Sequence, residues 1–144
     1  MKKAILFSIM LTLSIFLGNK SMASVSGDDN NWVLNKSVGN VDLYYKMGEC
    51  NGEKVIFLKF DNKNNYSIKV TWKEAIADKT FGKVVESFYG EKQLTLAPGV
   101  TSQDGCGSVV SPECLINLKT AVPTLPVDPL NLEFKDVTVS KVTN

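Results

Sequence analysis

Apolar and polar residues alternate along much of the chain, and this alternation predicts β-strands. Over residues 41–46 every second side chain is apolar, which is the period of a strand with one buried face. Residues 54–60 are almost continuously apolar and rich in β-prone side chains, so they predict a central strand that is covered on most of both faces. The alternation returns without a break over residues 66–73, where it predicts a further half-buried strand.

Clusters of turn-forming residues separate these strands. Residues 48–52 predict a turn ahead of the central strand. The stretch Asp61-Asn62-Lys63-Asn64-Asn65 contains side chains that tolerate a left-handed backbone and bond their own main chain, and it lies between two apolar runs. It therefore predicts a hairpin that joins residues 54–60 to residues 66–73.

The second half of the chain carries shorter strand signals. Turns, a loop rich in Ser and Gly at residues 101–112 and a connection with three prolines separate strand-like segments at residues 84–89, 93–96, 114–119, 130–134 and 137–139. The parity of the apolar residues switches between Phe134 and Val137, which predicts a bulge. About seven short strands predict an all-β fold, an antiparallel immunoglobulin-like β-sandwich, with a closed barrel as the alternative.

The chain resembles the immunoglobulin-like and fibronectin-III-like modules of bacterial exported proteins. The resemblance rests on a polar turn between two core strands and on a Leu-x-Pro-Gly turn ahead of a later strand, found in Val55-Ile56-Phe57-Leu58-Lys59-Phe60-Asp61-Asn62, Val70-Thr71-Trp72 and Leu94-Thr95-Leu96-Ala97-Pro98-Gly99. It implies a β-sandwich over roughly residues 41–142. The chain departs from antibody-type domains, because Pro112 stands two residues before Cys114, where the tyrosine corner would need a tyrosine.

The first 23 residues have the pattern of a secretory signal peptide. Three residues with two lysines precede an apolar run of 14 residues, Ala4 to Leu17, and the small-residue site Ser21-Met22-Ala23 follows. The run is shorter than the ~17–25 residues that span a bilayer, so we expect cleavage after Ala23 and no membrane span. Residues 24–31 predict a flexible polar leader, and residues 32–144 a single domain. The expected location is secreted or periplasmic.

Composition excludes several kinds of chemistry. The chain has no histidine and no arginine, and all 16 of its basic residues are lysine. Without histidine it lacks the commonest general base and zinc ligand, and without arginine it lacks the preferred group for phosphate and nucleic acid. Two oxygen-rich clusters, residues 27–31 and 61–65, do not match calcium-loop spacing. We therefore expect no catalytic residues, no metal, no cofactor and no nucleic-acid partner.

Three cysteines in an exported chain predict one disulfide and one further thiol. Cys106 and Cys114 lie close in a Ser/Gly-rich loop, so proximity favours that pair. Pairing Cys50 with Cys106 or with Cys114 is the alternative, and it stabilises more because it closes a longer loop. The third cysteine is available for a disulfide-linked dimer.

Aromatic residues provide the remaining candidates for a site. Tyr45, Tyr66 and Trp72 share the parity of aliphatic neighbours, so we expect them in the core. Trp32, Tyr44 and Tyr89 are expected to face solvent and are the candidate binding residues.

The sequence as a whole predicts an exported, non-enzymatic binding or structural module. Its partner is an unidentified extracytoplasmic protein or glycan. One alternative is a carbohydrate-binding module that uses these exposed aromatics. The other is a carboxylate-only hydrolase, which needs two acidic groups at roughly 5–10 Å across a cleft.

Overall fold

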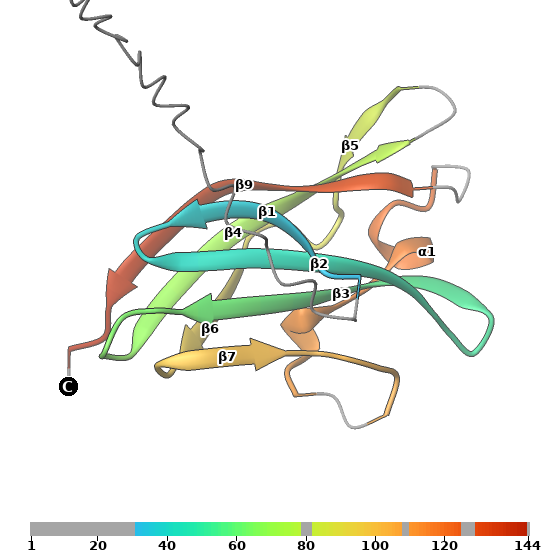
Figure 1. Cartoon of the computed structure of the whole chain (residues 1–144). Helices are drawn as coiled ribbons and strands as arrows, with labels where there is room; N and C mark the ends of the chain where they lie inside the picture. Colours follow the sequence, from blue (N-terminus) through green and yellow to red (C-terminus); the bar gives the residue numbers. More distant parts are fainter. Residues whose placement is uncertain (1–30, 79–81, 108–109, 125–128, 144) are drawn as a thin grey trace, which may run out of the picture.

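The computed structural model describes residues 31–78, 82–107, 110–124 and 129–143 of the 144-residue chain (Figure 1). This part forms nine strands: β1 (Val33–Val38), β2 (Val41–Cys50), β3 (Glu53–Asn62), β4 (Ile68–Asp78), β5 (Val84–Glu86), β6 (Lys92–Leu96), β7 (Gly99–Ser102), β8 (Leu115–Asn117) and β9 (Pro129–Lys141). Two short helical segments, η1 (Pro112–Cys114) and α1 (Leu118–Ala121), flank β8. The predicted signal peptide 1–23 and, except for Asn31, the predicted leader lie outside the described residues.

The first sheet is antiparallel in the order β1-β2-β3-β7, with β8 paired to the same edge of β3 as β7. Two-residue turns join its first three strands. Gly39 and Asn40 form one and Asn51 and Gly52 the other, and all four have positive φ. Such turns match the twist of the strands that they connect. Because β2 runs through Cys50, the turn predicted at residues 48–52 shrinks to Asn51 and Gly52.

The second sheet is built around β4. β9 pairs along one edge of β4, while β5 and β6 share the other edge. The register of β4 and β9 shifts between the pairs Thr71–Thr138 and Lys73–Lys135, and Asp136 has a φ of 51°. The bulge predicted from the parity switch between Phe134 and Val137 is therefore confirmed.

The hairpin predicted at residues 61–65 is wrong, because this segment crosses from the first sheet to the second. β3 has β2 on one edge and β7 with β8 on the other, so it has no edge left for β4. Asn62 shapes the crossing. Its side-chain amide donates to the backbone oxygens of Tyr66 and Ala97, both at 3.1 Å. Tyr66 precedes the strand and is 39% exposed, so its predicted place in the core is also wrong.

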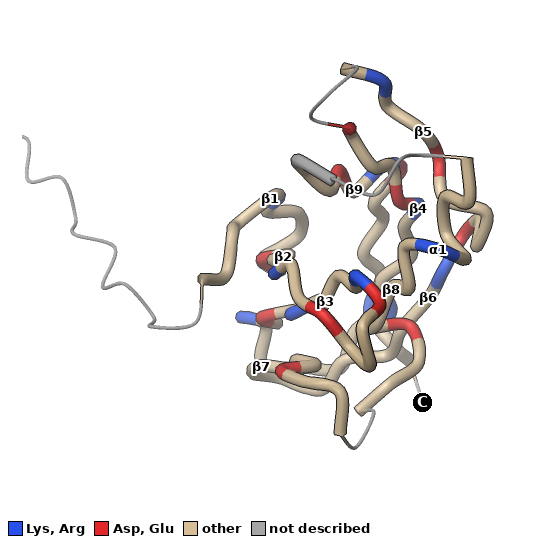
Figure 2. Tube along the Cα trace, turned by 90° about the vertical axis from the view of Figure 1, so that its right-hand side faces the viewer, with Lys and Arg blue, Asp and Glu red and all other residues tan. Residues whose placement is uncertain are grey.

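The two sheets pack face to face around one apolar core, and Figure 2 shows them as separate layers. Tyr45 and Trp72 lie in this core, as predicted. The ring of Phe60 is fully buried in it, with its centroid 5.0 Å from that of Trp72 and 6.1 Å from that of Phe134. Residues 54–60 form a central strand as predicted, since only Lys54 and Lys59 of that stretch are not buried.

Side chains close one open side of this two-sheet sandwich. The amide of Asn35 on β1 donates to the backbone oxygen of Leu132 at 2.7 Å and accepts from the backbone nitrogen of Phe134 at 3.2 Å. Lys36 donates to the oxygen of Phe134 at 2.9 Å. A primary amide carries the same donor and acceptor as a peptide group, so Asn35 acts as a short substitute for a strand along β9.

The structure confirms an all-β, mostly antiparallel fold of two sheets with one disulfide. Its first three strands lie in one sheet, whereas the third strand of an immunoglobulin domain lies in the opposite sheet from the first two. In the described part of the chain no helix has the length and apolar character to cross a membrane.

Candidate binding surface

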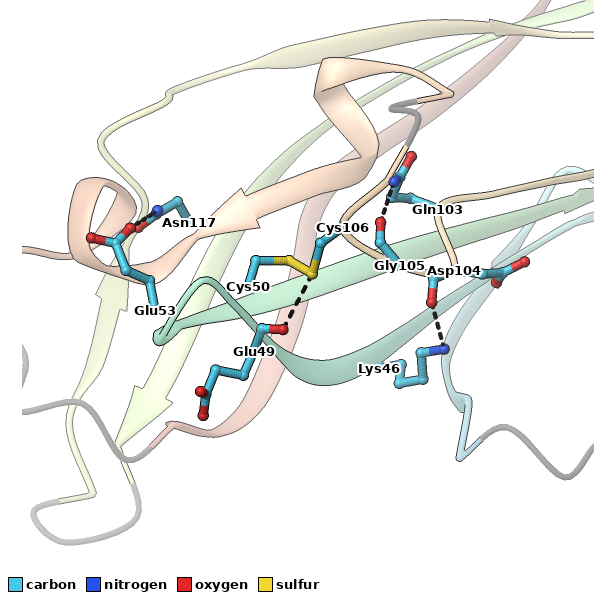
Figure 3. Close-up of a disulfide and its surroundings, with 9 residues drawn as sticks. All are labelled: Lys46, Glu49, Cys50, Glu53, Gln103, Asp104, Gly105, Cys106 and Asn117. Carbon is cyan, nitrogen blue, oxygen red and sulfur yellow. Dashed lines mark hydrogen bonds between the residues drawn. A yellow bond between two sulfur atoms is a disulfide. The ribbon is translucent and has the colours of Figure 1, made fainter.

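A disulfide joins Cys50, at the end of β2, to Cys106 in the loop after β7 (Figure 3). The two residues are 56 positions apart in sequence, and their Cα atoms are 5.6 Å apart. The favoured pairing of Cys106 with Cys114 is therefore not formed, and one of the two alternatives is. Cys114 is fully buried in the core between the sheets, while Cys106 is exposed on the outer side of the first sheet, so proximity in sequence does not bring them together.

Gln103 holds the start of the same loop. Its side chain is buried, its amide nitrogen donates to the backbone oxygen of Gly105, and its oxygen accepts from the backbone nitrogen of Val110 at 2.7 Å. The Gln103 backbone nitrogen donates to the oxygen of Leu58 on β3 at 3.1 Å. The loop is thus attached to the first sheet by this strand contact, by the disulfide and by Lys46 on β2, whose ammonium donates to the backbone oxygen of Asp104 at 3.3 Å; Figure 3 shows the last two.

Two of the three candidate aromatics meet on the outer face of the first sheet. Tyr44 on β2 is paired in register with Lys59 on β3, and the ammonium of Lys59 lies 4.4 Å from the ring centroid of Tyr44 and 5.0 Å from that of Trp32. The ammonium of Lys46 lies 4.8 Å from the same Trp32 centroid. We call these four residues the Trp32 cluster. The negative face of an aromatic ring attracts a cation, so each of the two lysines is held against a ring.

Sequence reasoning missed the two lysines of the Trp32 cluster. The alternation that turns Tyr44 outward also turns Lys46 outward, so that signal was present in the sequence. The position of Lys59 beside Tyr44 depends on the register of β2 and β3, which is set by the turn at Asn51 and Gly52.

A row of acidic residues borders the Trp32 cluster. Asp42 and Asp61 are paired across β2 and β3, next to the pair of Tyr44 and Lys59. Lys63 forms an ion pair with Asp42. The Ser37 hydroxyl also donates a hydrogen bond to the Asp42 carboxylate, at 2.6 Å. Burial alone would raise the pKa of Asp42, but these hydrogen bonds hold the pKa below the ordinary value of an aspartate. Asp42 is therefore a neutralised anion at the border of the cluster.

The third candidate aromatic, Tyr89, belongs to a different surface. It lies just before β6 in the second sheet and lines a groove of about 390 Å³ together with Lys92, Pro112, Glu113 and Leu115. A smaller groove of about 230 Å³ continues along β6 and shares Glu113. Trp32, Tyr44 and Tyr89 thus do not form one platform.

A buried ion pair lies behind the groove beside Tyr89. The side chain of Glu74 on β4 is fully buried; its Oε1 atom is 2.9 Å from the ammonium of Lys92 and accepts a hydrogen bond from the Trp72 indole at 3.0 Å. Continued alternation along β4 places Glu74 on the core side, so the sequence did contain a signal for this pair. The carboxylate of Glu113 lines both grooves, whereas that of Glu74 is fully buried and not accessible from them.

The described residues hold no group of three or more His, Cys, Asp or Glu side chains placed to bind a metal ion. In the oxygen-rich cluster 61–65, the side chains of Asn62 and Asn64 are used in hydrogen bonds to the chain itself. Asn64 donates from its backbone nitrogen to the Asn62 side-chain oxygen at 3.1 Å and from its amide to the Gly39 oxygen at 3.0 Å.

We expect the Cys114 thiol to be unreactive in the folded protein. Cys114 is fully buried, and burial raises the pKa of its thiol to about 11, so almost no thiolate exists at neutral pH. Alkylation of the oxidised protein with iodoacetamide should modify no cysteine in buffer and one per chain in denaturant. Covalent dimers on a non-reducing gel of the folded protein would show that the thiol does react. The burial of Cys114 thus disfavours the disulfide-linked dimer that the third cysteine predicts.

No protein-family model, curated protein or solved structure matches this chain. The resemblance to immunoglobulin-like and fibronectin-III-like modules therefore stays a prediction.

Proposed function

We propose that this protein is exported from the cytoplasm and acts outside it as a non-enzymatic binding module. The observation that carries the proposal is the disulfide between Cys50 and Cys106. Disulfides persist in oxidising compartments and are rare in the reducing cytoplasm. The predicted signal peptide, residues 1–23, points to the same location independently of the disulfide.

Binding is favoured over catalysis by the kinds of side chains that the surface offers. Several aromatic residues at the surface are paired with lysines, as at Trp32 and at Tyr89, whose ring centroid is 4.7 Å from the ammonium of Lys92. Such pairs supply contact area and charge, but they hold no poised acid, base or nucleophile. The carboxylate-only hydrolase is supported less, because Glu74 lies behind Lys92 rather than across a cleft from Glu113.

In this proposal the module plays a role like that of the immunoglobulin-like and fibronectin-III-like modules that it resembles. A rigid two-sheet frame presents loops and a sheet face to a partner, and its own strand order differs from theirs. The partner is an extracytoplasmic protein or glycan.

Export can be tested by producing the full-length chain in a Gram-negative bacterium and sequencing the N-terminus of each fraction. We expect a chain that begins at Ser24 in the periplasm or the medium, with Cys50 and Cys106 oxidised. The control is Leu11→Arg, which places a charge in the apolar run and should leave the chain in the cytoplasm. An unprocessed, reduced wild-type chain in the cytoplasm would overturn the proposal.

A further inference from the structure

We propose that the smaller of the two grooves beside β6 binds a neutral oligosaccharide, meaning a short chain of uncharged sugars. This inference rests on the proposed function, since it names the partner class of the exported binding module. The groove has a volume of about 230 Å³, which is comparable to that of one sugar ring. We call its five lining residues the β6 groove: Lys69, Gln93, Leu94, Thr95 and Glu113.

Three polar side chains of the β6 groove come from the outer face of the second sheet. Lys69 on β4 is paired in register with Thr95 on β6, and Gln93 lies two positions earlier on the same face of β6. All three residues are exposed. Within the part of the chain that the structure describes, none of the three side chains forms a hydrogen bond or an ion pair. Their polar groups are therefore available to a ligand.

Glu113 on η1 adds a charged acceptor to these groups. The Ser111 hydroxyl donates to its Oε2 atom, and this hydrogen bond holds the pKa of Glu113 below the ordinary value of a glutamate. The carboxylate is thus ionised at neutral pH and can only accept hydrogen bonds, whereas the ammonium of Lys69 can only donate them. A ligand that satisfies both groups must accept from Lys69 and donate to Glu113.

Sugars meet this requirement, because every hydroxyl group both donates and accepts. The amide of Gln93 and the hydroxyl of Thr95 also do both, so they can bond to sugar hydroxyls in either direction. The opposite charges of Lys69 and Glu113 balance each other. A simple anion would be repelled by Glu113 and a simple cation by Lys69, so the groove favours a ligand without net charge.

The larger groove gives the ligand room to continue. It has a volume of about 390 Å³, shares Glu113 with the β6 groove and adds the apolar side chains of Pro112 and Leu115. Apolar side chains can contact the C–H face of a second sugar. Stacking on an aromatic ring is not needed, and lysines already lie over Tyr89 and over the rings of the Trp32 cluster.

A peptide is the other class of ligand that both donates and accepts. Peptides bind to sheets chiefly through main-chain hydrogen bonds along the edge of a strand. The β6 groove instead offers the side chains of Lys69, Gln93 and Thr95 on the face of a sheet. This arrangement favours a sugar, and a peptide probe serves as an outcome of the test.

The test is isothermal titration calorimetry of the oxidised protein with maltotetraose, cellotetraose, chitotetraose and acetyl-triglycine amide. The variant Lys69→Ala/Gln93→Ala removes two exposed polar side chains from the β6 groove. The matched control is Asn65→Ala/Lys83→Ala, which removes one primary amide and one lysine from exposed positions that line neither groove. Far-UV circular dichroism checks that each variant folds.

We expect at least one of the three oligosaccharides to bind. Its affinity should fall about tenfold or more in Lys69→Ala/Gln93→Ala, because two hydrogen-bonding groups are lost, and by less than about twofold in the control. Glu113→Gln keeps the shape of the side chain and should lower the affinity by about threefold or more, since a charged acceptor bonds more strongly than a neutral one. Added salt should change the affinity by less than about twofold, because the ligand is uncharged.

Four results would overturn the inference. They are no binding of any of the three oligosaccharides, equal loss in the two double variants, binding that weakens strongly with added salt, and tighter binding of acetyl-triglycine amide than of the sugars. Because export is measured separately, each of these results would leave the proposed location standing.

Discussion

Replacing Lys92 with methionine should destabilise the protein by about 3–5 kcal/mol, because it leaves a carboxylate buried without its counter-charge. The side chain of Glu74 is fully buried, that of Lys92 is 10% exposed, and the two groups meet at 2.9 Å. Methionine preserves most of the volume of the lysine stem, so the loss reports the charge rather than a cavity. Urea denaturation followed by tryptophan fluorescence would measure it, since Trp72 donates to the same carboxylate.

The control for this experiment is Glu74→Gln/Lys92→Met, in which both charges are absent. The glutamine oxygen still accepts from the Trp72 indole, so the double variant should recover most of the stability that Lys92→Met loses. A Lys92→Met protein as stable as the wild type would show that the Glu74 carboxylate reaches solvent in the fold, contrary to the buried ion pair described above.

The strands were predictable where the cause lies within one strand. Residues 54–60 were recognised as a central strand because an apolar run that long must be covered on both faces, and β3 is paired on both edges. The bulge near Asp136 was recognised for the same reason, since a change of parity cannot occur in a regular strand. The place of Trp72 in the core was predictable from the alternation of apolar and polar residues along its strand.

The connections were less predictable, because a polar turn has the same chemistry in a hairpin and in a crossing between sheets. Residues 61–65 favour a turn both in a hairpin and in a crossing between sheets. The outcome was decided by β7 and β8, which occupy the edge of β3 that a hairpin partner would need. Tyr66 was misplaced for the related reason that the strand begins only at Ile68, after the crossing.

The candidate site was predictable in part. Alternation and position placed Trp32 and Tyr44 near solvent, and the structure brings them together through Lys59. That contact depends on the register of β2 and β3 and on where the chain before β1 places Trp32, and the sequence pattern predicts neither.

The cysteine pairing depends on which side of a sheet each thiol faces, and Cys114 faces the core while Cys106 does not.

Removing the disulfide should have an effect of similar size to removing Lys92. Closing a loop between residues 56 apart lowers the entropy of the unfolded chain by an amount worth about 4 kcal/mol on the chain-entropy model. The variant Cys50→Ala/Cys106→Ala should therefore lose about 4 kcal/mol of unfolding free energy, measured by urea denaturation. The thiol of Cys114 is left in place, because it is part of the core.

A matched control separates the cross-link from the side chains. Wild-type protein unfolded and refolded with a reductant keeps both cysteines but not the bond, so it should show the same loss as the alanine variant. Agreement between the two assigns the effect to the unfolded state, because the contacts of Gln103 with Leu58 and Val110 hold the loop in both proteins. A reduced protein as stable as the oxidised one would contradict this assignment and would mean that the unfolded chain already keeps Cys50 and Cys106 close together.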